Sequence, residues 1–191
     1  MSTKIVALVG SLRQGSLNRA LLREAAAVAP TGLEIELLEI GDVPLYNSDV
    51  QAQGFPEVVN RLGEAIRQAD GILLVTPEYN YSVSGVLKNT IDWISRLPNQ
   101  PFSEKPVAIM GASMGNLGTA RAQYHLRQIL VFLNPYVMNR PEIMVPSAQN
   151  KFDAQGQLTD DSTREHLVKF LNAFQTFVTR VGAAQSVLLG K

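Results

Sequence analysis

The sequence predicts an α/β fold in which helices cover both faces of a parallel β-sheet. Short apolar runs, among them residues 5–9, 71–75 and 107–110, alternate with longer segments whose apolar residues recur at helical spacing. Unbroken apolar runs are typical of strands buried on both faces, and their alternation with helices is typical of doubly wound sheets. Each of these three runs ends in a loop rich in glycine, hydroxyl or amide groups. Open α/β sheets bind their ligands at that edge.

The first predicted strand, residues 5–9, leads through a loop over residues 10–18 into a helix. The apolar spacing of this helix begins at Leu17 and stops before Pro30. At such a junction backbone N–H groups point at a common place, and the helix dipole adds about half a positive charge. We therefore expect the loop to bind a phosphate.

The composition of this first loop narrows the kind of phosphate. Gly10 and Gly15 have the spacing of a P-loop, but Ser16 stands where the P-loop lysine belongs, and no G-x-G-x-x-G fingerprint is present. A magnesium–nucleotide site is therefore disfavoured, and a terminal phosphate monoester bound without metal is favoured. The alternative is that Ser16 or Asn18 only caps the helix while Arg13 lies in solvent. The candidate phosphate ligands are Ser11, Arg13, Ser16 and Asn18.

The next elements lead to the central strand. Residues 33–38 alternate at their start between apolar and polar positions, which predicts a strand near an edge of the sheet. Residues 41–54 are expected to form a loop, and residues 57–70 a helix that returns the chain to the strand 71–75.

The loop after this central strand carries two aromatic rings, Tyr79 and Tyr81, beside a carboxylate, an amide and a hydroxyl. Pro77 holds the backbone of Thr76 extended. Aromatic rings and a fixed backbone can cover a flat heterocycle, and loop N–H groups can bond its ring nitrogens and carbonyls. The loop therefore suits a planar, partly polar ligand. The alternative is a surface loop whose tyrosines merely pack.

The remaining segments continue the alternation of helix and strand. The third glycine- and hydroxyl-rich loop spans residues 111–119. The whole chain is expected to form one domain, residues 1–191, with a five-stranded parallel sheet in the flavodoxin order 2-1-3-4-5. Its last elements are expected to be a helix over 86–94, a strand over 107–110, a helix over 119–133, a fifth strand near 137–138 or 143–145, and a helix from Asp160 or Ser162 to Val181, with a capping box from Ser162 to Glu165.

Composition excludes several classes of function. The chain has 17 basic and 17 acidic residues, so no net positive field for nucleic acid is expected. It has no cysteine, which excludes disulfides, thiolate metal sites and cysteine redox chemistry. His125 and His166 lie on different predicted helices without ligand companions, so no metal site is predicted. Without a leader or a run of about 20 apolar residues, the protein is expected to be cytoplasmic.

Several stretches resemble the NADPH-dependent FMN reductases, and among them the bacterial quinone and chromate reductases. The resemblance covers nearly the whole chain, and the first two motifs together make it specific. Two positions depart from the usual pattern: Ser84 replaces a proline, which should make its loop more mobile, and Thr119 replaces a glycine, which should narrow the third loop. The matching stretches are residues 10–18, 76–83, 87–93 and 124–133.

The resemblance implies a flavodoxin-like fold that holds FMN without a covalent bond, with NADPH or NADH as co-substrate. It also implies homodimers or homotetramers, with Arg121, Tyr124 and Glu142 at positions that link dimers. The FMN phosphate would lie in the first loop and the isoalloxazine ring against the other two. The FMN-binding residues would be Ser11, Arg13, Gly15, Ser16, Leu17, Asn18, Pro77, Glu78, Tyr79, Asn80, Tyr81, Ser113, Met114 and Gly115.

The expected activity is hydride transfer from NAD(P)H through bound FMN to a quinone, by ping-pong kinetics. Chromate, azo and nitro compounds, ferric chelates and free flavin are further candidate acceptors. The flavin carries this chemistry, so no side chain is predicted as a catalyst. The main alternative is a flavodoxin-like one-electron carrier, but such carriers are usually strongly acidic, whereas this chain has zero formal charge. A nucleotide-sensing domain, which would bind without turnover, is a third class.

Overall fold

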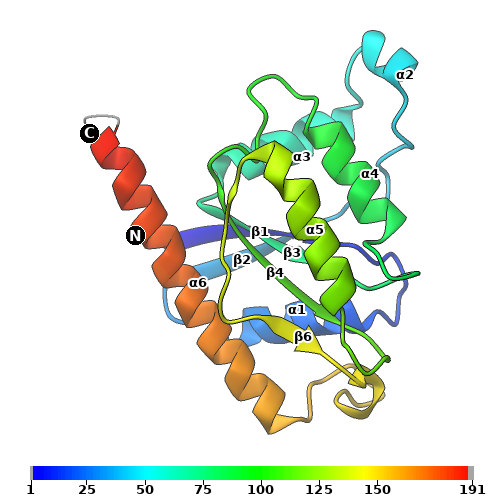
Figure 1. Cartoon of the computed structure of the whole chain (residues 1–191), viewed down its shortest axis with the longest axis vertical. Helices are drawn as coiled ribbons and strands as arrows, with labels where there is room; N and C mark the ends of the chain where they lie inside the picture. The colour runs from blue at the N-terminus through cyan, green and yellow to red at the C-terminus, as the bar shows by residue number, and fades with distance from the viewer. Residues whose placement is uncertain (1, 189–191) are drawn as a thin grey trace.

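The computed structural model describes residues 2–188 as a parallel sheet between two layers of helices (Figure 1). The strand order is β2-β1-β3-β4-β5, and β6 also pairs with β4. This confirms the predicted order 2-1-3-4-5. The strands are β1 (Thr3–Val9), β2 (Leu33–Leu38), β3 (Gly71–Val75), β4 (Pro106–Ala112), β5 (Tyr136–Val137) and β6 (Ile143–Val145).

The two helical layers each bury one face of the sheet. Along β1, Ile5, Ala7 and Val9 pack on one side with α1 and α6, while Val6 and Leu8 pack on the other with α3, α4 and α5. This alternation follows from the period of two in a strand and explains why the central strands are apolar at every position. The helices are α1 (Leu17–Ala27), α2 (Ser48–Ala52), α3 (Glu57–Gln68), α4 (Gly85–Ile94), α5 (Ala120–Leu133) and α6 (Asp161–Leu188), with a 3₁₀ turn at Ala148–Asn150.

The fifth position in the sheet is shared by two short strands. β5 pairs with the start of β4, at Pro106 and Val107, and β6 pairs with its end, from Met110 to Ala112. Both predicted locations are therefore strands. The intervening segment contains Pro141, which has no N–H group to donate to a ladder, so one continuous strand is disfavoured there.

The expected loop 41–54 contains a short helix, α2, which stands out from the body of the molecule in Figure 1. Asn47 caps it by accepting a hydrogen bond from the N–H of Asp49 at 2.8 Å. The base of this excursion is tied to α4, because the indole N–H of fully buried Trp93 donates to the carbonyl of Pro44 at 2.8 Å. The helix was missed because it is too short to show apolar periodicity.

The last helix begins at the first of its two predicted starts, next to Asp160, but ends later than predicted. Asp160 is its N-cap and accepts a hydrogen bond from the N–H of Thr163 at 2.9 Å, so the capping box expected at Ser162 is wrong. The helix continues past Val181 to Leu188, the last described residue, through residues 182–188, where alanine and glutamine favour helix. No helix among residues 2–188 is long and apolar enough to cross a membrane.

Candidate functional site

The three polar loops meet at the carboxyl edge of the sheet because their strands are neighbours. Val75 is in register with Val9 on one side and with Met110 on the other. The loops lie around a groove of about 230 Å³, and every lining residue except Ala112 is one that the sequence predicts. The lining residues are Ser11, Arg13, Ser16, Leu17, Pro77, Glu78, Tyr79, Ala112, Ser113 and Met114. Gly15, Asn18, Asn80, Tyr81 and Gly115 lie outside this lining.

The first loop leads into the N-terminus of α1. Ser16 is the N-cap, and its hydroxyl accepts a hydrogen bond from the N–H of Arg19 at 3.2 Å. Arg13 is exposed and donates to the carbonyl of Gly15 at 2.9 Å. The capping role considered for Ser16 is therefore present, and the Arg13 guanidinium still lies at the groove, where its positive charge adds to that of the helix N-terminus.

Asn18 joins the first loop to the third. Its side chain is buried, its amide N–H donates to the carbonyl of Ala112 at 2.9 Å, and its amide oxygen accepts from the Ala112 N–H at 2.9 Å. The amide thus pairs with the last residue of β4 as a neighbouring strand would. Sequence reasoning chose Asn18 as a phosphate ligand and did not name Ala112, because a pairing across 94 positions has no local signal.

The second loop contains a tight turn that displays its aromatic rings. The backbones of Tyr79 and Ser82 exchange two hydrogen bonds of 3.1 and 2.9 Å. Asn80 and Tyr81 between them have positive φ values of 48° and 66°, as in a type I′ turn. The side chains of Tyr79 and Tyr81 are consequently 53% and 64% exposed. The expectation that they only pack against protein is not met.

The base of this turn is fixed by Glu78. Its carboxylate accepts hydrogen bonds from the N–H groups of Arg121 and Ala122, at 3.0 and 3.2 Å. These N–H groups are in the first turn of α5, where a negative charge is favoured by the helix dipole. Because the Glu78 side chain is only 10% exposed, the carboxylate is shielded from solvent and its bonds to the helix are strong.

The second loop also packs closely against the end of β1. A Cβ atom on Gly10 would lie 2.5 Å from the Ser84 hydroxyl and 3.1 Å from Pro77, so only glycine fits. Ser84 is 2% exposed with φ −66°, an angle that proline also adopts. It is therefore packed inside the fold, and nothing in its placement supports the expected mobility. Its hydroxyl has no hydrogen-bond partner among residues 2–188.

The third loop follows β4 and is closed by Gly118. Gly118 has φ +60°, and a Cβ atom there would lie 2.8 Å from the backbone of Met144. Ser113 accepts a hydrogen bond from the N–H of Gly115 at 3.1 Å, and Met114 is 60% exposed beside the groove. Thr119 is fully buried and accepts a hydrogen bond from the side chain of Gln123. It packs against Gly111 at the start of the loop, so the expected narrowing of the loop stays a prediction.

Of the residues expected at a tetramer contact, Arg121 contacts this site through Glu78 and Tyr81. Arg121 and Tyr124 are on α5, and Glu142 precedes β6. Tyr124 is 51% exposed, and two further apolar side chains of the same helix, Val131 and Phe132, are 80% and 84% exposed. One side of α5 therefore presents apolar surface to the surroundings.

Comparison with known proteins decides the family. A family model described as NADPH-dependent FMN reductase matches residues 3–150. The chain belongs to this family. It is therefore an oxidoreductase that uses FMN with NAD(P)H as co-substrate, and the donors at the groove fit a flavin phosphate. A guanidinium, hydroxyl groups and a helix N-terminus are the groups that bind such a monoester without metal.

Individual relatives of this FMN reductase match nearly their whole length. The chain is 58% identical over 178 residues to an NAD(P)H-dependent FMN reductase of Pseudomonas aeruginosa, covering 93% of this chain and 96% of the relative. It is 55% identical over 181 residues to a quinone reductase of Escherichia coli, with the same coverage. A solved flavoenzyme NAD(P)H:(acceptor) oxidoreductase from Paracoccus denitrificans superposes with a TM-score of 0.85 at 38% identity, covering 93% of this chain and 98% of that one.

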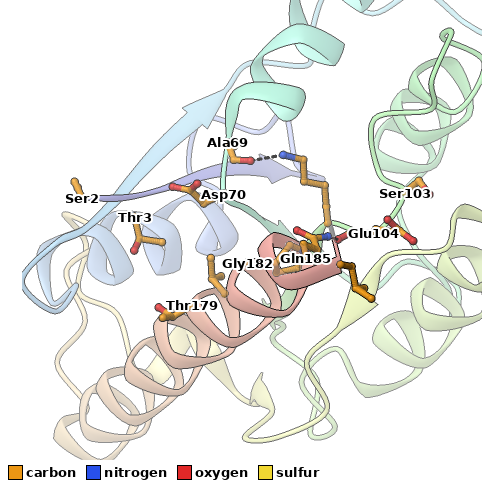
Figure 2. A pocket seen from close by; sticks show the side chains of 13 residues that line it. Ser2, Thr3, Ala69, Asp70, Ser103, Glu104, Thr179, Gly182 and Gln185 are labelled. Carbon is orange, nitrogen blue, oxygen red and sulfur yellow. Dashed lines mark hydrogen bonds between the residues drawn. The ribbon is translucent and has the colours of Figure 1, made fainter. Parts of the chain in front are cut away.

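A larger cavity, about 560 Å³, lies at the opposite end of the sheet between α6 and the amino ends of β1 and β4 (Figure 2). Its most buried charged group is Lys105, whose ammonium donates to the carbonyls of Arg67, at 2.8 Å, and Ala69. Burial lowers the pKa of Lys105. Because these two carbonyls lie at the C-terminal end of α3, the Lys105 side chain satisfies that helix end, and the cavity holds none of the predicted site residues.

Proposed function

We propose that this FMN reductase transfers hydride from NAD(P)H to quinones, with FMN bound in the groove between the three loops. The observation that carries the proposal is that residues predicted separately for the phosphate and for the ring line one groove. The names of the relatives support the acceptor class: besides the quinone reductase, a 2-hydroxy-1,4-benzoquinone reductase of Burkholderia is 41% identical over 179 residues. FMN, when bound, supplies the chemistry of accepting a hydride and passing it on.

The first loop would hold the phosphate end of FMN. Arg13 and the hydroxyl groups of Ser11 and Ser16 supply donors, and Gly15 and Leu17 flank them in the chain. Asn18 contributes by fixing the third loop, since both polar atoms of its amide are paired with Ala112. The phosphate site is thus made by the end of β1 and the N-terminus of α1.

The second and third loops would hold the ring end. Pro77, Glu78 and the displayed tyrosine turn form one side, and Ser113, Met114 and Gly115 form the other. The side chains of this protein would bind and orient the flavin and its substrates, and we assign a proton-transfer role to none of them. Tyr79 and Tyr81 are exposed, so a nicotinamide and a quinone would reach the ring from the same open side in succession. We therefore propose ping-pong kinetics.

An open groove without a catalytic side chain restricts the size and chemistry of the acceptor only weakly. For that reason we also expect turnover of chromate, azo and nitro compounds, ferric chelates or free flavin. We further propose assembly into homodimers or homotetramers, because the exposed apolar residues Val131 and Phe132 extend the surface around Tyr124.

Steady-state kinetics of the FMN-loaded protein test the proposed activity. NADPH and NADH would be varied separately against several fixed concentrations of benzoquinone, with chromate and free FMN as comparison acceptors. Parallel double-reciprocal lines and the highest kcat/KM for the quinone are expected. Intersecting lines would contradict a shared open site, and rapid reduction of free FMN with no quinone turnover would contradict the acceptor class.

A further inference from the structure

The turn Tyr79–Ser82, called the tyrosine turn below, contacts α5 at further points besides the backbone bonds to Glu78. Beyond the two backbone bonds to Glu78, the Arg121 guanidinium donates to the other oxygen of that carboxylate at 3.2 Å. The same guanidinium lies over the ring of Tyr81, 3.6 Å from its centroid. One side chain of α5 thus contacts both the residue before the turn and a ring inside it.

A third tie comes from the next turn of the same helix. The Nδ1 atom of His125 lies 3.0 Å from the hydroxyl of Ser82, the last residue of the turn. Arg121 and His125 are four positions apart, so they share one side of α5. The turn is consequently held at its start, middle and end by a single helix.

The turn needs such support because its backbone is unfavourable. Tyr81 has φ 66°, a left-handed conformation that bulky side chains seldom adopt. Tyr81 is 64% exposed, and the Arg121 guanidinium lies over its ring. A cation over the face of an aromatic ring is attractive, and a planar guanidinium can stack there while it donates to a carboxylate. Lysine can pair with the carboxylate or place its compact charge over the ring, but it has no planar group that stacks on the ring while it donates to the carboxylate.

We infer that Arg121 is a positioning residue that holds Tyr81 and the Tyr79–Ser82 turn in the conformation that meets the flavin ring. Its guanidinium links Glu78 to Tyr81, so it acts on the ring site through these two side chains. The inference rests on the proposed function only in taking this turn as the ring-binding side of the groove. It gives Arg121 a role within its own chain, apart from any contact between dimers.

The first test compares Arg121→Ala and Arg121→Lys with Arg127→Ala. Arg127 is on the same helix but donates to Asn139 and to the carbonyl of Met138, so it serves as the matched control. The readouts on oxidised, FMN-loaded protein are the visible circular dichroism of the flavin and the FMN dissociation constant from flavin fluorescence. Neither requires turnover.

Both Arg121 variants should change the flavin circular dichroism and lower kcat/KM by about two- to thirty-fold, the range expected for loss of a cation–π contact. FMN affinity should change less than in an Arg13 variant, because the phosphate end is untouched. Arg121→Lys should not restore the flavin spectrum. If both Arg121 variants match Arg127→Ala in spectrum and kcat/KM, the positioning role is wrong. Should Arg121→Ala not fold, the lysine variant alone decides.

The second test asks whether Arg121 acts through Tyr81. In a Tyr81→Leu background, Arg121→Lys should have a smaller effect on the flavin spectrum than in wild type, and fully additive effects would contradict the inference.

Tyr124→Ala controls for assembly, because Tyr124 belongs to the proposed tetramer contact but has no described bond to the turn. The Arg121 variants should still change the flavin spectrum when their oligomeric mass in solution equals that of wild type. If FMN binds but NAD(P)H does not reduce it, the proposed function fails while these spectral comparisons still decide the role of Arg121.

Discussion

The buried amide of Asn18 has its donor and its acceptor engaged by one backbone residue, Ala112. Asn18→Ala should therefore lower the free energy of unfolding of the FMN-free protein by about 1–3 kcal/mol for each partner left unpaired. Asn18→Asp should cost more, because a carboxylate would face the Ala112 carbonyl. Urea unfolding measures both. If Asn18→Ala leaves stability unchanged and weakens only FMN binding, Asn18 is a direct phosphate ligand instead.

For Arg13 we expect an effect on FMN affinity and not on stability, because its guanidinium is exposed at the groove and makes one described bond, to its own loop. Arg13→Ala should hardly change stability but should raise the FMN dissociation constant about ten- to a hundred-fold, as expected for losing a hydrogen bond to a charged group. Fluorescence titration measures the constant. Arg23→Ala, exposed on α1 away from the groove, is the control. Equal dissociation constants for the two variants would remove Arg13 from the phosphate site.

Sequence could indicate these residue types but not their partners. Hydroxyl, guanidinium and aromatic groups stand in short runs after apolar strands, and that local pattern is enough to predict the groove. The pairing of Asn18 with Ala112, and of Glu78 with the N-terminus of α5, joins positions 94 and 43 residues apart. Such pairings depend on which strands become neighbours, and a single sequence carries no direct record of them.

At the scale of elements, the serines that precede α4 and α1 have different roles. The Ser84 hydroxyl makes no capping bond to α4 and has no hydrogen-bond partner in the described part of the chain, whereas the Ser16 hydroxyl caps α1. Ser84→Ala should leave the free energy of unfolding unchanged or raise it by up to about 1 kcal/mol, since an unpaired buried hydroxyl is lost. Ser16→Ala, the matched control, should lower it by about 1 kcal/mol. Equal losses in the two variants, measured by urea unfolding, would contradict this account of α4.

The N-terminus of α6 should make stability depend on acid pH. Hydrogen bonds from the Thr163 side chain and backbone, and then from Lys151, lower the pKa of Asp160. A carboxylate whose pKa is lowered by folding stabilises the protein above its unfolded pKa, and this contribution is lost as pH falls through the folded pKa. Asp160→Asn keeps the cap but cannot titrate.

The thermal midpoint of the Asp160→Asn variant should therefore fall less than that of wild type between neutral and acid pH. Asp161→Asn makes the same charge change at the next position, which is 89% exposed, and should follow wild type. Differential scanning calorimetry at a series of pH values gives the comparison. Parallel curves for wild type and Asp160→Asn would show that Asp160 is not stabilised by these bonds.

The elements that sequence predicted well are those with a strong period. The apolar strands and the long helices before α6 lie within a few residues of their expected bounds, because the period of their buried residues defines them, whereas α6 continues past its expected end at Val181 to Leu188. Short elements such as α2 and β5 carry too few residues for a period, and their formation depends on a cap at Asn47 and on pairing with β4. The sequence left the start of α6 open between Asp160 and Ser162, because both are capable caps, and the structure uses Asp160.

At the scale of the whole molecule, the order of the strands explains how the site forms. β1, β3 and β4 are neighbours, so loops that are distant in the sequence meet at one edge, and the helices of both layers bury the strands beneath them. That order could be predicted, because alternating strands and helices permit few arrangements. The exposed apolar surface of α5 could not be predicted, because apolar residues that remain exposed have the same spacing in the sequence as those that pack in the core.

The central claim, that bound FMN passes electrons from NAD(P)H to a quinone, is tested most directly by an anaerobic absorption spectrum. FMN-loaded protein would be titrated with NADPH or NADH, and then with benzoquinone. The account predicts that the flavin band bleaches with one equivalent of at least one nicotinamide and recovers fully with one equivalent of quinone. A bound flavin that neither nicotinamide bleaches, or a bleached one that benzoquinone does not restore, would contradict it.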